Sequence, residues 1–331
     1  MREPAFWWRP HGGSLLSAAA AVYGAVAWLR MRSQGRNAGV PVVCLGNLTV
    51  GGAGKTPAAL AVAHLLLAER ERPVFLSRGY GGRLRGPVRV NRAVHHAADV
   101  GDEPLMLARL APTIVARDRV AGAKAARAAG ASVIVMDDGF QNPSLAKDLA
   151  IVLVDGPRGI GNGRIVPAGP LRAPLEIQIA HAQALVIVGA PQRSAAVADV
   201  ARRYGIATFH ARLEPDRGSL AALGHRKVLA FAGIANPEKF FATLADAGIA
   251  VAERASFPDH HRYTAAEAQA LLGRASAANL VLITTEKDAA RLAGDPALVA
   301  LAGRAIALPV RLVIEEQDAF RQMVLSAVKR G

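Results

Sequence analysis

The chain has 331 residues, of which 52% are hydrophobic and 20% charged, and its formal net charge is +14 at pH 7. This length allows two domains of ordinary size, and the single cysteine, Cys44, excludes a disulfide framework and a cysteine-based zinc site. The positive charge favours an anionic partner, whether nucleic acid, a phosphorylated substrate or an anionic lipid surface.

The N-terminal segment, residues 1–36, carries the sharpest change in composition. Trp7 and Trp8 precede an apolar run from Ser14 to Leu29, and Arg30 and Arg32 follow it. The run is shorter than the roughly 20 residues that a helix needs to span a bilayer. We therefore expect an amphiphilic helix that lies in one leaflet, with the arginines against anionic lipid. A helix packed on the protein body is the alternative, while a signal peptide lacks its small-residue cleavage site.

The stretch from Val40 to Pro57 predicts a nucleotide site. An apolar strand is followed by a glycine-rich loop and by a helix that runs to Ala68. Backbone N–H groups of such a loop can surround an anion, a lysine can reach the outer phosphates, and a threonine hydroxyl can ligate Mg²⁺. We expect ATP to bind through Thr49, which stands where the strict P-loop pattern has glycine, and through Val50, Gly51, Gly52, Ala53, Gly54, Lys55 and Thr56.

Acidic and aromatic side chains follow the next predicted strands. Arg78 and Tyr80 come directly after a strand at Pro73–Ser77, where parallel sheets place ligands. Asp102 and Glu103 open a helix, a place where carboxylates also stabilise the helix dipole. A strand at residues 132–136 runs into Asp137 and Asp138, a pattern typical of the carboxylates that hold Mg²⁺ in P-loop enzymes.

The remaining chain predicts further α/β structure in two parts. Strands at residues 148–155 and 184–188 extend a mostly parallel sheet covered by helices on both faces. The glycine- and proline-rich loop between them, which includes Asn162 and Arg172, is long enough to suggest a function. We expect a P-loop NTPase-like domain at residues 37–212 plus 312–331 and a smaller α/β domain at residues 222–303, joined by a two-segment linker. A strand-like run at residues 304–314 is expected to return the chain to the first domain.

Eight motifs in this order resemble those of the tetraacyldisaccharide 4'-kinase family, the lipid A 4'-kinases of Gram-negative bacteria. They are GNLTVGGAGKTP, LSRGYGG, VGDEP, MDDGFQN, GNGRIVPAGPLR, FAGIANP, FPDHHRY and TTEKDAARL. The resemblance covers nearly the whole chain. It implies transfer of the γ-phosphate of ATP to the 4'-hydroxyl of a tetraacyldisaccharide 1-phosphate, forming lipid IVA at the cytoplasmic face of the inner membrane. Separately from the resemblance, we expect the protein to be a monomer.

The resemblance also implies roles for individual residues. Asp102 is similar to the family's catalytic base and His260 to its partner, although His261 remains an alternative. Lys55 and Thr56 match the P-loop pair. The acidic set around Mg²⁺ is Glu103, Asp137 and Asp138, and the Thr56 hydroxyl is a further Mg²⁺ ligand. Arg172 belongs to a motif in which this chain has Ala173 where the family usually has glutamate, so any contact made by that carboxylate must come from elsewhere.

Two other functions fit parts of the sequence. A soluble P-loop kinase or NTPase acting on a small metabolite would not need residues 1–36. A nucleotide-switched basic adaptor would bind membrane or nucleic acid, but the sequence shows no basic face interleaved with aromatic residues, so we expect no nucleic-acid partner. The segment Thr285-Glu-Lys-Asp fits either a nucleotide contact or a helix N-cap.

Overall fold

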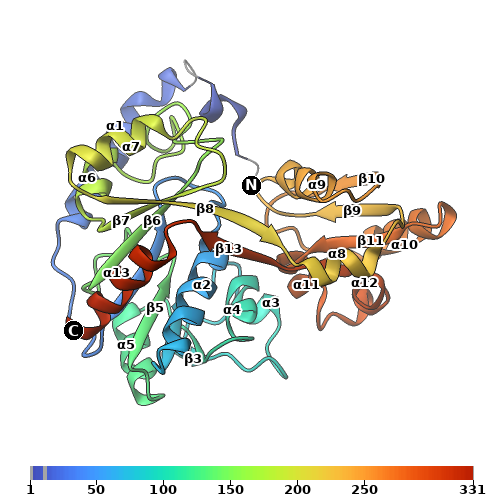
Figure 1. Cartoon of the computed structure of the whole chain (residues 1–331), viewed down its shortest axis with the longest axis horizontal. Helices are drawn as coiled ribbons and strands as arrows, with labels where there is room; N and C mark the ends of the chain where they lie inside the picture. Colours follow the sequence, from blue (N-terminus) through green and yellow to red (C-terminus); the bar gives the residue numbers. More distant parts are fainter. Residues whose placement is uncertain (1–2, 10–12, 331) are drawn as a thin grey trace.

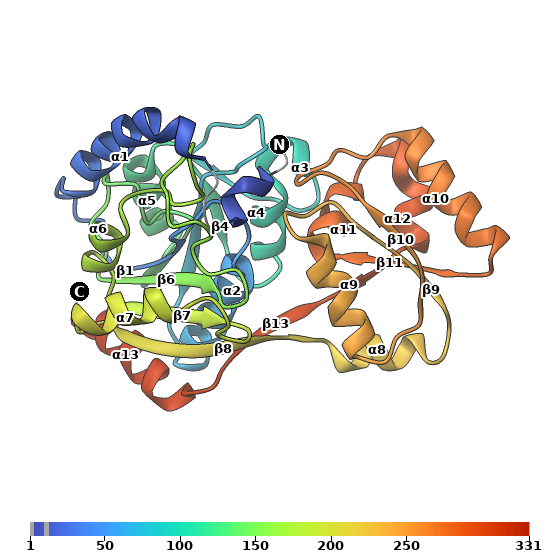
Figure 2. The same ribbon diagram turned by 90° about the horizontal axis from the view of Figure 1, so that it is seen from above.

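Two β-sheets organise the protein. The computed structural model describes residues 3–9 and 13–330. A nine-stranded sheet has the order β13-β8-β7-β6-β1-β5-β2-β4-β3, and a four-stranded sheet has the order β10-β9-β11-β12. The two lie at opposite ends of the molecule, and the long strands β8 and β13 run between them (Figures 1 and 2).

The larger sheet is parallel except at its two outermost pairs, β13 with β8 and β3 with β4. The smaller sheet is parallel throughout. The strands of the larger sheet are β1 (Val42–Asn47), β2 (Pro73–Ser77), β3 (Val88–Arg89), β4 (Thr113–Val115), β5 (Val133–Asp137), β6 (Leu149–Asp155), β7 (Ala184–Val188), β8 (Ala207–Pro215) and β13 (Val310–Ile314). Those of the smaller sheet are β9 (Val228–Ala232), β10 (Val251–Ser256), β11 (Val281–Thr285) and β12 (Ile306–Leu308).

Helices cover both faces of each sheet. Around the larger sheet they are α1 (Ser17–Met31), α2 (Lys55–Ala68), α3 (Ala97–Val100), α4 (Asp102–Leu107), α5 (Arg119–Ala128), α6 (Leu175–Ala180), α7 (Ala195–Arg203) and α13 (Gln317–Arg330). Around the smaller sheet they are α8 (Arg217–Leu223), α9 (Pro237–Asp246), α10 (Ala265–Ala277), α11 (Glu286–Leu292) and α12 (Val299–Arg304). Short 3₁₀ helices occur at Ala5–Trp8, Ser14–Leu16 and Pro296–Leu298.

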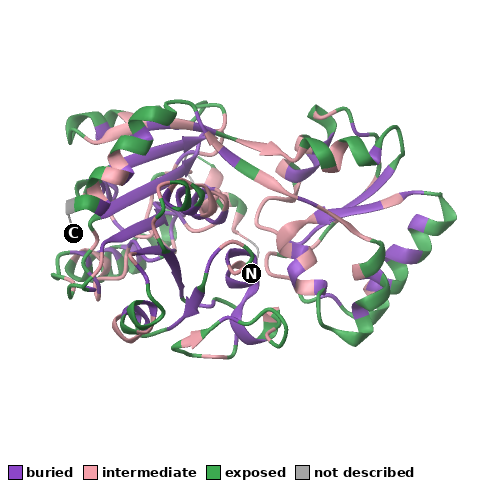
Figure 3. Ribbon diagram, turned by 60° about the horizontal axis from the view of Figure 1, so that its bottom comes forward, coloured by how far each residue is buried: buried purple, intermediate pink, exposed green. Residues whose placement is uncertain are grey.

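Strand β1 shows how the larger sheet is built. Val42 and Cys44 pack into the core on the side of α5, α6 and α7, whereas Val43 and Leu45 pack into the core on the side of α2 and α13. Because successive strand residues point to opposite faces, a continuous apolar run is what a sheet covered on both faces requires. Figure 3 shows the strands buried and the outer helix surfaces exposed. The expected α/β architecture is confirmed.

The connection between the two sheets differs from the expected single strand at residues 304–314. The run divides at Pro309, with β12 pairing in the smaller sheet and β13 pairing with β8 in the larger one. Proline lacks an N–H group, so it suits a break between two ladders. The smaller sheet therefore extends to Leu308, beyond the expected limit of residue 303.

Helix α1 lies along the outside of the larger sheet. Its buried side holds Ala20, Gly24 and Met31, and its exposed side carries Val22, Val26 and Leu29. The helical stretch Ser14–Met31 has 18 residues and a mean hydropathy of 1.3, which is long and apolar enough to cross a membrane by length and composition. The expectation that the run is too short to span was therefore wrong, because the helix continues past Leu29.

Candidate functional site

The predicted phosphate-binding loop connects the central strand β1 to α2. Gly54 directly precedes the helix with a φ of +87°, a conformation that favours glycine. The Asn47 side chain donates to the carbonyl of Gly51 at 2.7 Å, and the same carbonyl lies 3.5 Å from Lys55 Nζ. Lys55 and Thr56 thus occupy the first turn of α2, where backbone N–H groups and the helix dipole favour an anion.

A neighbouring loop supports the phosphate-binding loop from one side. Val50 N donates to the carbonyl of Pro170 at 2.8 Å, and Arg172 Nε donates to the carbonyl of Thr49 at 3.1 Å. Arg172 Nη1 also donates to Asp138 Oδ1 at 2.6 Å. Arg172 therefore ties the loop at Thr49 to the acidic end of β5.

Asp137 and Asp138 stand at the carboxyl end of β5, beside β1. Lys55 Nζ lies 3.9 Å from Asp138 Oδ1. Burial raises the pKa of Asp138, but Lys55 and Arg172 outweigh burial and hold its pKa well below the usual range. Burial raises the pKa of Asp137 to about 7, and the negative charges of Asp138 and Glu103 add to this rise. The positive charges around Asp137 are thus too weak to offset its burial and the neighbouring carboxylates.

The residues at this end of β5 fit a divalent cation. Among the described residues, Asp137 Oδ1 is buried and has no hydrogen-bond partner, and the nearby Thr56 is buried too. A hydroxyl and carboxylates are the oxygen donors that Mg²⁺ prefers. A cation here would satisfy the unpaired oxygen and offset the accumulated negative charge.

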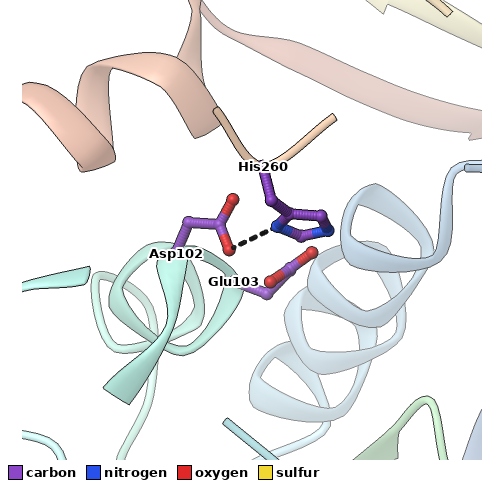
Figure 4. Close-up of side chains that lie close together, drawn as sticks. All are labelled: Asp102, Glu103 and His260. Carbon is purple, nitrogen blue, oxygen red and sulfur yellow. Dashed lines mark ion pairs between the residues drawn. The ribbon is translucent and has the colours of Figure 1, made fainter. Parts of the chain in front are cut away.

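Asp102, Glu103 and His260 form a second cluster. Asp102 and Glu103 begin α4, and His260 arrives on the loop that follows β10 of the smaller sheet (Figure 4). His260 Nδ1 lies 3.4 Å from Asp102 Oδ1, and one possible ligand atom from each of the three residues falls within 4.8 Å of the others. The ring of His260 also meets that of Tyr80 edge-on, with 5.0 Å between centroids.

The backbone at His260 is held in an unusual conformation. Its φ is +55°, which few non-glycine residues adopt, and its N–H donates to the carbonyl of Gly233 at 3.1 Å. Such conformations persist only where surrounding contacts impose them, and they cluster at functional sites. The loop therefore aims the imidazole at Asp102.

The pKa values of Asp102 and Glu103, the two acids of this cluster, are shifted in opposite directions. Asp102 is buried, yet hydrogen bonds with His260 and Glu103 and the charge of Arg291 outweigh burial and hold its pKa well below the usual range. Burial raises the pKa of Glu103, which is paired with Lys287 at 2.7 Å. Burial lowers the pKa of His260, but Asp102 outweighs burial and leaves it raised. Asp102 is therefore ionised at neutral pH and faces an imidazole that protonates readily.

Two further residues contact this cluster: Lys287, which lies in the segment Thr285-Glu-Lys-Asp considered above, and Arg291, which was missed from the sequence. Lys287 and Arg291 lie on α11 and reach across to Glu103 and Asp102. The motif TTEKDAARL does begin a helix with a cap, since Asp288 N donates to Thr285 Oγ1 at 3.1 Å. Two cations four residues apart lie on one helix face, and that spacing was the signal available.

The other residues singled out in the sequence take different places. His261 bonds Glu267 at 3.0 Å and stacks on Phe257, so it is His260 that faces Asp102. Asn162 donates to the carbonyls of Phe6 and Ala168, which fixes the N-terminal segment on the loop after β6. Arg78 is exposed, and Ala173 is buried in the apolar core beside α6.

A cavity of about 350 Å³ opens beside the loop that carries His260. Its walls come from the N-terminal segment, the loop after β6 and the smaller sheet, and include Trp8, Arg158, Phe257 and Asp259. Glu3 lines it as well, paired with Arg158 at 2.9 Å. The cavity is therefore lined by both parts of the molecule and reaches Asp259, the residue before His260.

Comparisons with known proteins agree with this geometry. A family model described as "Tetraacyldisaccharide-1-P 4'-kinase" (LpxK) matches residues 13–329. The chain is 54% identical to a tetraacyldisaccharide 4'-kinase of Rhodopseudomonas palustris strain BisB18, over 100% of this chain and 97% of the relative. It is 52% identical to the protein of that name from Bradyrhizobium sp. strain BTAi1, over 98% and 94%.

A solved structure has the same fold. The crystal structure of "apo" form LpxK from Aquifex aeolicus in complex with ATP superposes with a TM-score of 0.72 at 27% identity, over 95% of this chain and 99% of that one. Together with the identities above 50%, the match of the family model to residues 13–329 shows that the chain belongs to the tetraacyldisaccharide-1-P 4'-kinase family.

Proposed function

We propose that the protein transfers the γ-phosphate of ATP to the 4'-hydroxyl of a tetraacyldisaccharide 1-phosphate and so forms lipid IVA in lipid A biosynthesis. The observation that carries this proposal is the ionised Asp102, paired with His260 at 3.4 Å, near a phosphate-binding loop that presents Lys55. The names of the relatives and the ATP complex of the Aquifex aeolicus protein supply the substrates.

Phosphoryl transfer needs alignment and charge neutralisation more than covalent catalysis by the protein. Residues 49–56 would hold the phosphates through backbone N–H groups, and Lys55 would place its positive charge near the γ-phosphate. Thr56, Asp137 and Asp138 would hold Mg²⁺, with Glu103 close enough to add its charge. When bound, Mg²⁺ neutralises part of the negative charge on the phosphates.

Asp102 would act as the general base. The acceptor hydroxyl loses its proton to the Asp102 carboxylate as its oxygen forms a bond to the γ-phosphorus, and the bond from that phosphorus to the bridging oxygen of ADP breaks. His260 would keep the carboxylate oriented and stabilise its charge until the proton arrives. General-base catalysis of this kind typically contributes about 100- to 10,000-fold.

We infer that the acceptor reaches Asp102 through the cavity lined by Trp8, Arg158 and Phe257. A cavity of about 350 Å³ falls within the range of roughly 300–1,000 Å³ typical of small-molecule sites. Glu3 lines the cavity, and its Oε2 accepts from Trp8 Nε1 and Arg158 Nη2, so polar and aromatic groups of the wall are held in place for a sugar.

The site combines residues of both sheets, so we propose that the part around the smaller sheet, residues 222–308, acts as a domain that closes on the nucleotide-binding part. Lys239 on α9 reaches Asp155 at the end of β6, with 2.8 Å between Nζ and Oδ2. Closure would bring His260 against the general base Asp102. It would also exclude water from the site, which limits wasteful hydrolysis of ATP.

We further propose that α1 holds the enzyme, as a monomer, at the cytoplasmic face of the inner membrane. Leu15, Val22, Val26 and Leu29 are exposed, and Arg30 and Arg32 follow them. An exposed apolar helix face next to arginines suits an anionic lipid surface. An acylated acceptor would be presented at that surface.

The direct test is incubation of the purified protein with γ-labelled ATP, Mg²⁺ and the disaccharide 1-phosphate in detergent. We expect a labelled lipid that carries the new phosphate at the 4'-position, and Lys55→Met should abolish its formation. Absence of labelled lipid with protein that binds ATP would contradict the proposed reaction.

A further inference from the structure

Helix α11 of the smaller sheet docks on α4, the helix that begins with Asp102 and Glu103. Thr285 caps it, and the helix places Lys287 and Arg291 on the side facing α4. Lys287 bonds Glu103 at 2.7 Å, and Arg291 bonds Asp102. The cations of α11 thus pair with both acids at the start of α4.

Arg291 makes an unusually complete set of contacts. Its Nε and Nη2 both donate to Asp102 Oδ2, at 2.9 and 2.5 Å. Its Nη1 donates to the carbonyl of Gly233 at 2.6 Å and to Asp288 Oδ1 at 2.8 Å. The side chain is only 6% exposed. A planar guanidinium bonded at every nitrogen has a fixed orientation, which an ammonium group on a lysine would lack.

The residues behind Arg291 are fixed as well. Asp288 is buried and also accepts from Tyr263 Oη at 2.9 Å, from Thr285 Oγ1 at 2.6 Å and from Gly233 N at 3.0 Å. Asp288 is therefore anchored by the smaller sheet from several directions. Through Arg291, that anchoring reaches the Asp102 carboxylate.

The consequence concerns the two oxygens of Asp102. Oδ2 takes both hydrogen bonds from Arg291, whereas Oδ1 faces His260. Rotation of the carboxylate would break two charge-assisted hydrogen bonds, which are stronger than neutral ones. Oδ1 is thus the oxygen left to meet an incoming hydroxyl.

We propose that Arg291 is a positioning residue for phosphoryl transfer, fixing the Asp102 carboxylate so that Oδ1 faces the acceptor hydroxyl. This inference rests on the proposed kinase reaction. It adds that α11, and not only the loop of His260, brings the smaller sheet into the active site. Arg291 touches neither substrate in this scheme and acts only through Asp102.

The test compares Arg291→Met and Arg291→Lys with wild type in the labelled-lipid assay, with ATP affinity measured in parallel by titration. We expect Arg291→Met to lower kcat about 10- to 100-fold, the usual effect of losing a supporting partner of a reactive group, while the Kd for ATP changes less than about 3-fold. Arg291→Lys keeps one charged donor and should recover part of kcat. Arg274→Met removes an exposed arginine of the smaller sheet that pairs with Glu253 and should leave kcat unchanged.

The double variant Asp102→Asn with Arg291→Met distinguishes an Arg291 that positions the Asp102 carboxylate from one that only stabilises the folded protein. If Arg291 acts through Asp102, its replacement costs little further kcat once Asp102 is replaced, because coupled residues are not additive. The proposal would be overturned if Arg291→Met lowered kcat by the same factor in wild type and in Asp102→Asn. It would also be overturned if Arg291→Met alone kept the wild-type kcat per ATP-binding site. Should Arg291→Met fail to bind ATP, Arg291→Lys decides, because wild-type kcat there contradicts a need for the guanidinium. Lipid phosphorylation by the wild type tests the kinase reaction separately.

Discussion

Asp102 Oδ1 and His260 Nδ1 lie 3.4 Å apart although the two residues belong to elements of different sheets. Asp102 begins a helix beside the larger sheet, and His260 is carried by a loop of the smaller one. Asp102 is held by Arg291 and His260 by a hydrogen bond to the carbonyl of Gly233, which also accepts from Arg291. The pair therefore depends on how the two parts of the chain meet.

Replacement of His260 should slow the reaction, whereas replacement of its neighbour should not. We expect His260→Gln to lower kcat about 10- to 100-fold, within the range of general acid–base effects, with ATP affinity retained. His261→Gln is the matched control, because His261 bonds Glu267 away from Asp102. A larger loss of kcat in His261→Gln than in His260→Gln would reverse the assignment.

Removal of the bond between Lys239 and Asp155 should weaken closure. This contact joins α9 to the end of β6 and is partly exposed, so its contribution is about 1 kcal/mol or less. We expect Lys239→Met to lower kcat/KM for the lipid about 2- to 5-fold and to leave ATP affinity unchanged. Steady-state kinetics beside Arg274→Met measures this, and equal values for both variants would show that the contact has no part in closure.

The exposed face of α1 should govern binding to lipid. Combined replacement of Val22, Val26 and Leu29 by serine removes most of that apolar face and should lower partitioning to phosphatidylglycerol vesicles at least about 10-fold. The control replaces Val94 and Val299, which are equally exposed but lie elsewhere, by serine. Vesicle sedimentation measures both. Unchanged partitioning of the α1 variant would show that another surface binds lipid.

The capping box of α10 gives a pH-dependent contribution to stability. Thr264 Oγ1 accepts from Glu267 N, and the Glu267 carboxylate accepts from Thr264 N. Burial raises the pKa of Glu267, but the bonds with Thr264 and His261 outweigh it and lower the pKa below 4.5. A lowered pKa means that the stabilisation is present above pH 4.5 and is lost as the pH falls through the folded-state pKa.

We therefore expect Glu267→Ala to lower the free energy of unfolding by about 1 kcal/mol at pH 7 and by less at pH 4. Urea unfolding of the variant and wild type at both pH values measures the difference. A difference that grows on acidification would contradict the ionised cap.

The sequence predicted those features that depend on local pattern. Apolar runs at Pro73–Ser77 and Ala184–Val188 form strands with the expected limits, because a buried parallel strand is continuous in hydrophobicity. The glycine-rich loop before Lys55 has the expected place between β1 and α2, because glycine accepts positive φ values such as the +87° of Gly54 that other residues rarely adopt.

Contacts between segments far apart in the chain could not be predicted from local sequence pattern. The sequence placed Lys287 in a possible nucleotide contact or helix cap and did not single out Arg291. Only the docking of α11 on α4 shows the two cations facing Glu103 and Asp102. The choice between His260 and His261 depended on the folded loop, in which His260 faces Asp102 at 3.4 Å and His261 bonds Glu267 at 3.0 Å. Ala173 lies in the apolar core, and the sequence alone did not predict that this residue is buried.

The most direct measurement is the single-turnover rate of phosphate transfer by Asp102→Asn, made beside a titration of ATP binding. Asparagine keeps the shape of the side chain but cannot accept the proton of the acceptor hydroxyl. The account predicts a loss of about 100-fold or more in the transfer rate with ATP affinity within about 2-fold of wild type. A wild-type transfer rate in this variant would contradict a catalytic base assembled from Asp102, His260 and Arg291.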